Sequence, residues 1–390
     1  MNLDPPTNLN PPTNRERTLY RVLLVGGYGL FGSKLAARLA LDPLIDLTIC
    51  GRSLAAAAKL ADSLCRQTGC QRFHAVRIDV RDPGLAEQIR AGGFDAVIHT
   101  SGPFQGQGYE VARACIEAGA HYIDLADGRD FVCGIGELDA DAKQANVLVT
   151  SGASSVPALS TAVADHLAQE FDEVHGIDIG INPANQTERG LATVRAILGY
   201  CGAAFPHWRD GRWQRAFGWQ GLRRQAYPAP VGVRWLAQCD VPDLQLHPAR
   251  YPGVRTVTFR GGLELRWLHF GSWLMAAIRR AGLVRDWSRY SAQLKTISDW
   301  FIRFGTDAGA MHVEVDGLGK GGAPLRRCWT LVATNGDGPY VPTLASAALV
   351  GKLARGEIAF RGACPCVGLL TLQDFIDATH GLAITTSTSE

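Results

Sequence analysis

The sequence lacks several features that mark particular classes of protein. Its 390 residues carry a formal net charge of only +2, so we do not expect nucleic acid as a main partner. None of its ten cysteines has the paired spacing of structural zinc sites, and no two histidines have HExxH spacing, so no metal site is expected. The most apolar later stretch, 267–278, is too short and interrupted to span a bilayer.

The amino terminus lacks the apolar run of a signal peptide and is instead polar and rich in proline. We therefore expect a flexible tail over residues 1–17 and a cytoplasmic protein with no integral membrane segment. The hydrophobic fraction of 46% is that of an ordinary globular chain, and the length suffices for two packed domains.

A glycine-rich turn directly follows the apolar run 20–25 and precedes a helical apolar stripe. Its glycines have the spacings of both GxGxxG and GxxGxxG. The residues of the turn are Gly26, Gly27, Tyr28, Gly29, Leu30, Phe31 and Gly32. A turn without side chains lets a pyrophosphate approach the backbone, and free N–H groups at a helix start favour anionic oxygens. The pattern predicts a Rossmann dinucleotide site, the alternative being an ordinary glycine turn.

The second predicted strand, 47–50, ends in a basic residue. Arg52 lies 20 positions after Gly32, where an NAD-selective site would carry Asp or Glu to accept from the ribose 2'-hydroxyl. Arg52 and Ser53 can instead bind a 2'-phosphate. We therefore expect NADP(H) as the cofactor, unless Arg52 is an ordinary surface arginine.

The alternation of strands and helices continues to residue 150. Further strands are expected at 73–79, 94–99, 121–125 and 146–150, with helices such as 54–64 and 109–118 between them. This order predicts an α/β fold with a doubly wound parallel Rossmann sheet over residues 18–155. Side chains at the strand ends should border the cofactor. Asp79 and Val80 are placed at the adenine, and Ser101, Gly102 and Pro103 at the nicotinamide half.

These segments resemble the saccharopine dehydrogenase-like oxidoreductases over roughly the first 165 residues. Besides the glycine turn, the resemblance is carried by residues 51–53, 95–98, 102–104, 114–125 and 152–157. It implies an NADP-binding Rossmann domain, a second α/β domain with a mostly antiparallel sheet, and a carboxyl-terminal chain that returns to the first domain. Implied activities are saccharopine formation or cleavage, related reductive condensations of amino acids, and reduction of lipid-linked substrates. After Asp124-Leu125, relatives often show a Gly-Glu pair where this chain has Ala126-Asp127-Gly128-Arg129.

Substrate contacts are predicted at the ends of later strands. The candidates are Phe104, Tyr122, Asp124, Asp127, Ser154 and Ser155. The two serines precede an apolar helical run, so one is expected as its N-cap with Pro157 in the first turn. The alternative is that this helix start holds a substrate carboxylate or carbonyl oxygen. No tyrosine is followed four positions later by lysine, so the proton-donating pair of short-chain dehydrogenases is missing and the catalytic residue stays unassigned.

Beyond Pro157 short alternating segments replace the regular alternation of strands and helices. Strands are expected at 174–181, 254–259, 263–267, 312–315 and 329–332, with a hairpin loop at 317–322. We assign 156–338 to a substrate or dimerisation domain, 339–380 to helices that return to the Rossmann domain, and 381–390 to a flexible tail. All nine tryptophans lie in this second region, where they form a core, an apolar pocket or a membrane-facing flap.

The function predicted is an NADP(H)-dependent oxidoreductase that transfers a hydride to or from an amino-acid or imine, carbonyl or lipid-linked small molecule. The alternative is an NADP(H)-binding sensor or scaffold without turnover, because the same glycine turn serves both. A large separate second domain favours the enzyme. By family expectation, an exposed second sheet would favour a homodimer. The sequence decides neither the substrate nor the direction of the reaction.

Overall fold

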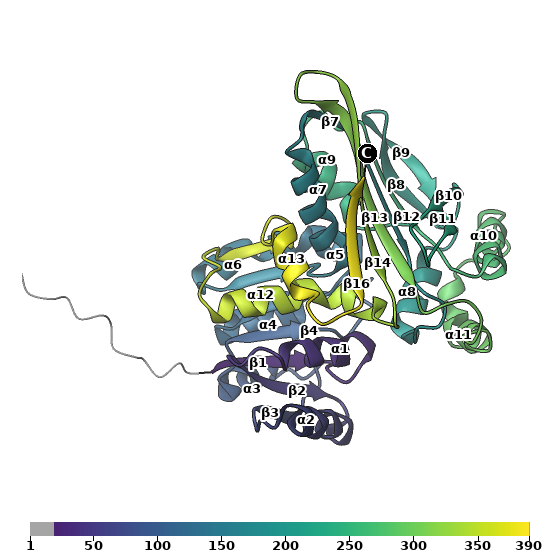
Figure 1. Ribbon diagram of the computed structural model, residues 1–390. Coiled ribbons are helices and arrows are strands. Elements are labelled where there is room, and N and C mark those ends of the chain that lie inside the picture. Colours follow the sequence, from purple (N-terminus) through teal and green to yellow (C-terminus); the bar gives the residue numbers. More distant parts are fainter. Residues whose placement is uncertain (1–18, 390) are drawn as a thin grey trace, which may run out of the picture.

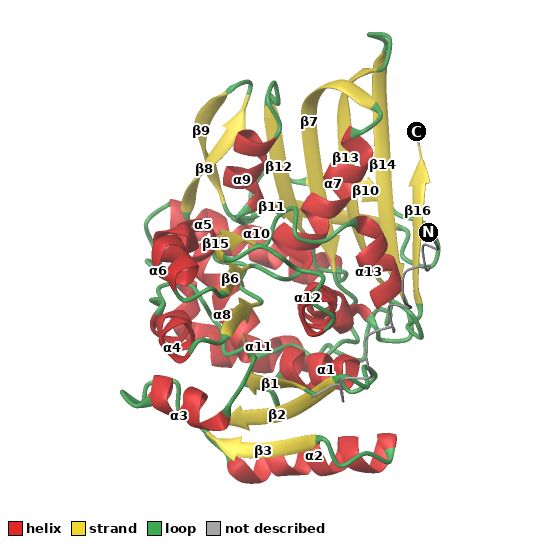
Figure 2. Cartoon of the chain, turned by 90° about the vertical axis from the view of Figure 1, so that its left-hand side faces the viewer, coloured by secondary structure: helices red, strands yellow, loops and turns green. Residues whose placement is uncertain are grey.

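Two seven-stranded sheets form the framework of the protein, the first below the second in Figure 2. The computed structural model describes residues 19–389, so the predicted tail at 1–17 lies outside the described residues. The strands of the first sheet are all parallel, in the order β15-β6-β5-β4-β1-β2-β3. The order of β1 to β6 is that of the Rossmann fold. The doubly wound parallel sheet predicted from the sequence is confirmed.

The first domain alternates strands and helices. Its strands read as continuous apolar runs because helices cover both faces of the sheet, and all four residues of β4 are buried. Its elements are β1 (Tyr20–Val25), α1 (Leu30–Leu39), β2 (Ile45–Gly51), α2 (Leu54–Thr68), β3 (Phe73–Arg77), α3 (Leu85–Gly92), β4 (Ala96–His99), α4 (Glu110–Ala118), β5 (His121–Asp124), α5 (Arg129–Gly134), α6 (Asp139–Gln144) and β6 (Leu148–Ser151).

The second domain is built on a mixed sheet with the order β10-β11-β12-β7-β13-β14-β16. Only β12 and β7 pair in parallel, which confirms the mostly antiparallel sheet. Its elements are α7 (Ser160–Ala168), β7 (Phe171–Asn182), α8 (Leu191–Tyr200), β8 (Ala204–Arg209), β9 (Arg212–Phe217), β10 (Arg223–Ala226), β11 (Val233–Gln238), α9 (Asp243–Arg250), β12 (Thr256–Gly261), α10 (Arg266–Arg280), α11 (Ser291–Asp299), β13 (Gly309–Gly319) and β14 (Pro324–Ala333). The loop between β13 and β14 falls at the predicted hairpin.

The strand predicted at 263–267 is wrong, because helix α10 begins at Arg266. Five residues with alternating apolar side chains fit a strand, but the apolar positions continue at Phe270 and Leu274. From Trp267 onward that spacing is helical.

The carboxyl-terminal chain returns to both sheets. It forms α12 (Leu344–Ala354), β15 (Gly362–Pro365), α13 (Leu372–Ala378) and β16 (Ile384–Ser389). Strand β15 joins the first sheet beside β6, and α12 packs against α1. Thr371 caps α13 in a capping box with Asp374.

A flexible tail over 381–390 was expected, but residues 384–389 form β16 and pair with β14. Serine and threonine carry too little apolar surface to mark a strand in the sequence. The open edge of β14 supplies the hydrogen-bonding partners that order this segment. Figure 1 shows β16 lying along that edge.

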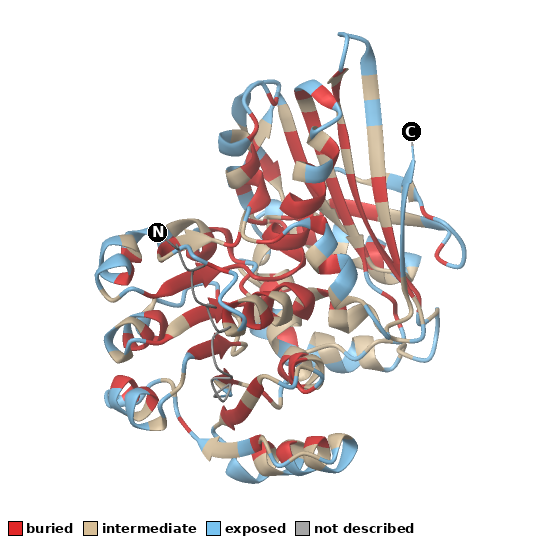
Figure 3. Cartoon of the chain, turned by 60° about the vertical axis from the view of Figure 1, so that its left-hand side comes forward, coloured by how far each residue is buried: buried red, intermediate tan, exposed pale blue. Residues whose placement is uncertain are grey.

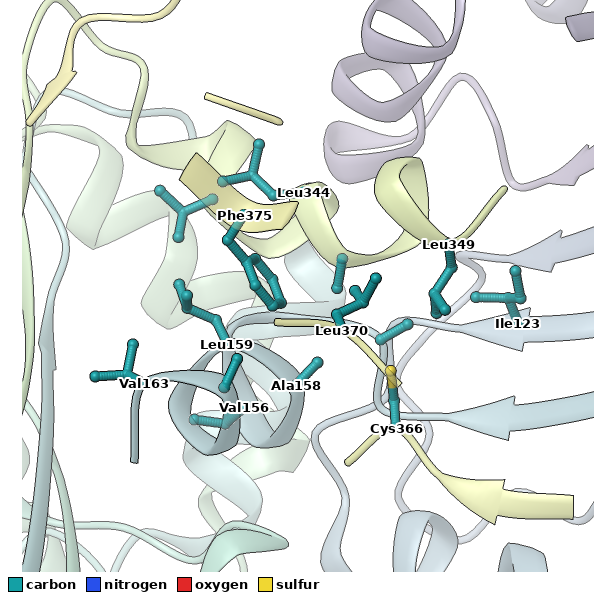
Figure 4. Close-up of a cluster of buried hydrophobic side chains, with 14 of the residues drawn as sticks. Ile123, Val156, Ala158, Leu159, Val163, Leu344, Leu349, Cys366, Leu370 and Phe375 are labelled. Atoms are coloured by element: carbon teal, nitrogen blue, oxygen red, sulfur yellow. The ribbon is translucent and has the colours of Figure 1, made fainter. Parts of the chain in front are cut away.

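One continuous hydrophobic cluster joins the two domains and the returning chain. In Figure 4, Leu370 and Phe375 of the returning chain lie near the 156–163 segment that leads into α7, and Leu349 lies beside Ile123 of β5. Helix α7 packs in turn on β7 and β13 of the second sheet. Figure 3 shows that the buried residues concentrate in the sheets and in the elements between them. The junction of the domains is therefore apolar and closely packed.

The described residues contain neither a helix that could span a membrane nor a group of side chains that could hold a metal ion. Between residues 19 and 389 no helix combines the length and the apolarity needed to cross a bilayer. Within the same range no group of three or more His, Cys, Asp or Glu side chains could hold a metal ion.

Candidate functional site

The glycine turn joins β1 to α1 at the carboxyl edge of the first sheet. Gly26 has a φ of +73°, a conformation that L side chains rarely adopt. A Cβ on Gly32 would lie 2.4 Å from the Gly26 carbonyl oxygen and 2.7 Å from the Gly27 Cα, so α1 starts in direct backbone contact with the turn. Gly29 is exposed at the N-cap of α1. These roles correspond to the GxxGxxG spacing of Gly26, Gly29 and Gly32.

This turn fits the pyrophosphate of a dinucleotide. The first amides of α1 have no acceptor within the helix, and no side chain of Gly29 stands in front of them. The positive end of the helix dipole points the same way. Leu30 and Phe31, also predicted at this site, are the first two residues of α1.

Tyr28 connects the glycine turn to the end of β2. Its hydroxyl oxygen accepts a hydrogen bond from the Ser53 amide at 3.1 Å. A Cβ on Gly51 would lie 2.5 Å from its ring, so glycine is required beneath it. The Ser53 hydroxyl accepts from the Ala56 amide and thereby caps α2. The β2–α2 turn is therefore held in place from both sides.

Arg52 projects from this fixed turn into solvent. Across residues 19–389 its guanidinium has neither a hydrogen bond nor an ion pair, and the side chain is exposed. An unpaired guanidinium beside the capping Ser53 and the Tyr28 hydroxyl is the chemistry that a 2'-phosphate requires.

The other residues predicted at the cofactor follow β3 and β4. The carboxylate of exposed Asp79 accepts from the Arg81 amide and shapes its own turn, and Val80 is half-buried. A Cβ on Gly26 would lie 2.5 Å from Ser101 Oγ, so the loop after β4 lies against the glycine turn. Gln107 donates to the carbonyl oxygens of Ser101 and Pro103, which fixes the Gly102 turn between them.

Aromatic side chains pack beneath this loop. His99 Nδ1 lies 3.2 Å from the Tyr122 hydroxyl, and Phe104 meets the His99 ring edge-on at 5.1 Å between ring centroids. All three side chains are buried, and burial lowers the pKa of His99 to about 4. The ring is therefore neutral at pH 7. Phe104 and Tyr122, predicted to contact substrate, belong to the layer that supports the site.

Asp124 organises the loop between β5 and α5 from inside the protein. One of its carboxylate oxygens accepts from the Ser151 hydroxyl and from the amides of Ala126 and Gly152, each at 2.9 Å. Its exposure is 0%, so a substrate contact would require the loop to open. Burial raises the pKa of Asp124 to about 6, although these hydrogen bonds oppose the increase.

The serines before α7 do not act as predicted. The backbone forms a π-type turn over Ser155–Leu159, and Ser154, its N-cap, makes no capping hydrogen bond with its side chain. Ser154 thus occupies the predicted N-cap position, with Pro157 in the turn that follows, but makes no capping hydrogen bond. The chain is in an extended conformation at Val156, which breaks the ordinary geometry of a helix start. Ser154 and Ser155 are both buried, so the predicted substrate contact stays a prediction.

Asp127 is the predicted substrate residue that remains accessible to solvent. Gln105 donates to its carboxylate at 3.1 Å, and desolvation by the surrounding protein raises its pKa. Across the domain junction stands Tyr200, the last residue of α8. Burial, followed by Cys239 and Asp127, raises the pKa of the Tyr200 hydroxyl well above its ordinary value. Asp127 of the first domain is therefore close enough to Tyr200 of the second domain to affect its pKa.

Arg129, two residues after Asp127, connects the first domain to the second. Its guanidinium donates to the Pro206 carbonyl oxygen at 2.9 Å, pairs with Asp240, and lies over the Phe205 ring. Burial raises the pKa of Asp240 to about 6, and Arg129 opposes that increase. The sequence reasoning missed Arg129, Asp240 and Tyr200. The available signal was the position of Arg129 in the segment that departs from the pattern of relatives.

Residues 22–165 match the family model described as the saccharopine dehydrogenase NADP binding domain. No curated protein matches the sequence significantly. The apo saccharopine dehydrogenase (L-Glu forming) of Saccharomyces cerevisiae shares the fold with a TM-score of 0.67 and 14% identity, over 95% of this chain and 100% of that chain. The amine dehydrogenase of Mycobacterium smegmatis gives a TM-score of 0.46 and 12% identity, over 89% and 94% of the two chains.

The match over residues 22–165 contains the glycine turn, Arg52 and Asp127, and the likeness to the yeast enzyme extends the shared fold through the second domain. Residues 22–165 are therefore similar to an NADP-binding domain of a dehydrogenase, which supports an oxidoreductase, and the whole chain shares the fold of the yeast enzyme.

Proposed function

We propose that the protein catalyses hydride transfer between NADP(H) and an imine or carbonyl carbon of a small molecule, bound where the glycine turn faces α8. The observation that carries the proposal is the position of the exposed Asp127 carboxylate. Gln105 donates a hydrogen bond to it, and it lies two residues before Arg129, which contacts the second domain at the Pro206 carbonyl oxygen and Asp240. The second domain also reaches the start of α1, because a Cβ on Gly190 would lie 3.6 Å from Leu30 Cδ2. The glycine turn proposed to bind phosphate and the carboxyl group proposed to exchange a proton thus lie along the carboxyl edge of the first sheet.

Arg52 is proposed to select the phosphorylated dinucleotide. Its guanidinium carries a fixed positive charge and has no carboxylate partner to displace within the described part of the chain. The Ser53 hydroxyl and the Tyr28 hydroxyl stand on the same turn and can complete the contacts of a 2'-phosphate. Binding there needs no rearrangement of the protein.

Asp127 is proposed as the group that exchanges a proton with the substrate. NADPH, when bound, supplies the hydride for the carbon, and reduction of C=N or C=O also requires one proton on the nitrogen or oxygen. Desolvation raises the pKa of Asp127, so a larger fraction of this carboxyl stays protonated as the pH approaches neutrality. Burial keeps the nearby Tyr200 hydroxyl neutral, so it adds no charge that would oppose a proton transfer at Asp127.

The experiment that tests the cofactor site compares NADPH and NADH binding in the wild type, Arg52→Ala and a control, Arg66→Ala. Arg66 is an exposed arginine in the last turn of α2, at the opposite end of that helix. One charge-assisted contact with phosphate contributes about 1.5–2 kcal/mol, so Arg52→Ala should weaken NADPH binding roughly 10- to 30-fold. NADH binding should stay unchanged in both variants. Equal losses for both nucleotides would show that Arg52 does not read the 2'-phosphate.

Asp127→Asn tests the proton-transfer role. Keto acids with amines and unsaturated acyl compounds are screened for NADPH oxidation, and the pH dependence of kcat is measured on the substrate found. The rate of reduction should fall as the pH rises through the raised pKa of Asp127. The asparagine variant should lose roughly 100-fold in kcat together with that pH dependence, while NADPH binding is unchanged. A variant that keeps the wild-type pH profile would exclude Asp127 as the proton donor.

A further inference from the structure

Helices α10 and α11 present apolar side chains to solvent at the outer edge of the second domain (Figure 1). On α10 these are Trp267, Phe270 and Leu274, and in and after α11 they are Ile297, Trp300 and Phe304. We call these six side chains the α10–α11 edge. Leu274 is 54% and Trp300 is 66% exposed. Single exposed apolar residues are ordinary, but a group of them on neighbouring helices indicates an interaction surface.

The apolar side of α10 is the side that faces solvent. His269 and Ala276 are buried, and the His269 ring packs against Trp219 at 5.5 Å between ring centroids. Trp267, Phe270 and Leu274 follow one another at intervals of three and four residues, which places them together on the opposite side of the helix. The helix is thus anchored by one face, and its second apolar face is only partly covered, because Phe270 meets the Trp235 ring while Leu274 stays 54% exposed.

The two helices form one surface. The chain turns back after α10, and the Trp267 ring at the start of α10 meets Phe301, just after α11, at 4.1 Å between ring centroids. Phe301 then contacts Phe304. At the other end, the Trp287 indole donates to the Met275 carbonyl oxygen. The exposed aromatic groups of α10 and of the segment after α11 are therefore neighbours.

The segment that contains this surface carries an excess of positive charge. Residues 265–304 hold six arginines, one lysine and two aspartates, a formal charge of +5 in a chain whose total is +2. In the part of the chain that the structure describes, exposed Arg266, Arg285 and Arg289 form no ion pair. Both aspartates are engaged, since Asp299 pairs with Lys295 and Asp286 accepts from the Ser288 amide. The α10–α11 edge therefore combines exposed apolar side chains with exposed arginines that form no ion pair among the described residues.

We propose that the α10–α11 edge binds the surface of an anionic phospholipid membrane. Indole, phenyl and leucyl groups on one side of a helix, bordered by arginines, have the composition of helices that lie in the headgroup region. The apolar side chains enter the boundary between headgroups and acyl chains, and the arginines contact lipid phosphates. A protein partner would have to supply both acidic groups and a matching apolar face, whereas an anionic lipid surface supplies both everywhere. The proposal does not depend on the reaction.

The test is flotation of the full chain with vesicles of phosphatidylcholine alone and of phosphatidylcholine mixed with phosphatidylglycerol. The edge variant is Phe270→Glu with Leu274→Glu. The control is Leu41→Glu, because Leu41 is 64% exposed and lies at the end of α1 in the first domain. Thermal melts verify that both variants fold, as expected for changes at exposed positions. Arg285→Gln with Arg289→Gln tests the electrostatic part separately.

The wild type and Leu41→Glu should float with the anionic vesicles, with a blue shift of tryptophan emission. The edge variant should lose at least tenfold in partitioning. The arginine variant should lose binding mainly to the anionic vesicles and at low salt. Absence of wild-type binding to anionic vesicles would overturn the proposal. So would edge variants that bind as the wild type does, or light scattering that shows a wild-type dimer which the edge variant converts to monomer.

Discussion

Asp243 is a buried carboxyl group at the start of α9 whose ionisation should be visible in the stability of the protein. Its exposure is 0%, and the Ser160 hydroxyl donates to one of its oxygens. His247 Nε2 lies 3.6 Å from the same oxygen, but burial lowers the pKa of His247 to about 3, so the ring carries no charge at pH 7. Burial raises the pKa of Asp243 from 3.8 to about 7, against the opposing effect of Ser160.

The sign of the effect follows from the two pKa values. As the pH rises above 4, the carboxyl of the unfolded chain ionises first, while that of the folded protein stays protonated until about pH 7. The stability contributed by Asp243 is therefore complete below pH 4 and is lost as the pH rises through 7. A difference of about three pH units corresponds to roughly 4 kcal/mol in total, of which about 2.5 kcal/mol falls between pH 5 and pH 8.

Asp243→Asn removes the ionisation and keeps an oxygen that accepts from Ser160. The new amide group lies where the second carboxylate oxygen has no hydrogen-bond partner in the described residues, so it costs about 1–3 kcal/mol at every pH. Guanidinium chloride unfolding, followed by tryptophan fluorescence, should show the variant less stable than the wild type at pH 5. At pH 8 the difference should have moved by about 2.5 kcal/mol in favour of the variant.

The comparison between pH 5 and pH 8 isolates Asp243, because other carboxyl groups titrate alike in both proteins. Asp62→Asn, at an exposed position of α2, should leave the pH dependence unchanged. A difference between Asp243→Asn and the wild type that is the same at pH 5 and pH 8 would refute the reasoning. It would mean that Asp243 ionises in the folded protein as an ordinary carboxyl group does.

Two further substitutions test the architecture around the site. Gly32→Ala places a Cβ 2.4 Å from the Gly26 carbonyl oxygen, so α1 must move and NADPH titration should show at least tenfold weaker binding. Gly136→Ala, with nothing within 4 Å of its Cβ, should bind NADPH as the wild type does. Thr371→Ala removes the capping box of α13 and should lower the free energy of unfolding by about 1 kcal/mol in denaturant titration, whereas Thr371→Ser should keep most of it.

The sequence by itself determined the features that depend on neighbouring residues. Continuous apolar runs predicted strands buried on both faces, and β1 to β6 of the first sheet form where they were expected. The seventh strand, β15, lies in the segment 339–380 for which only helices were expected. The glycine turn could be predicted from the sequence because Gly26, Gly29 and Gly32 all lie at the single connection between β1 and α1. The change to alternating segments after Pro157 likewise predicted a mostly antiparallel sheet. Spacing left two assignments of the glycines open, and the φ of Gly26 favours one of them.

Only the tertiary structure decided which distant residues meet. Tyr200 reaches the neighbourhood of Asp127, and Arg129 pairs with Asp240, across more than 70 residues of intervening chain. Periodicity reports which face of an element is apolar and says nothing about the element that covers it. The same limit explains β16, which is ordered by the edge of β14, and α10, whose apolar residues face solvent instead of the core. Residues that are neighbours in the sequence determined most of the individual helices and strands. Packing between distant segments determined which of these elements lie side by side.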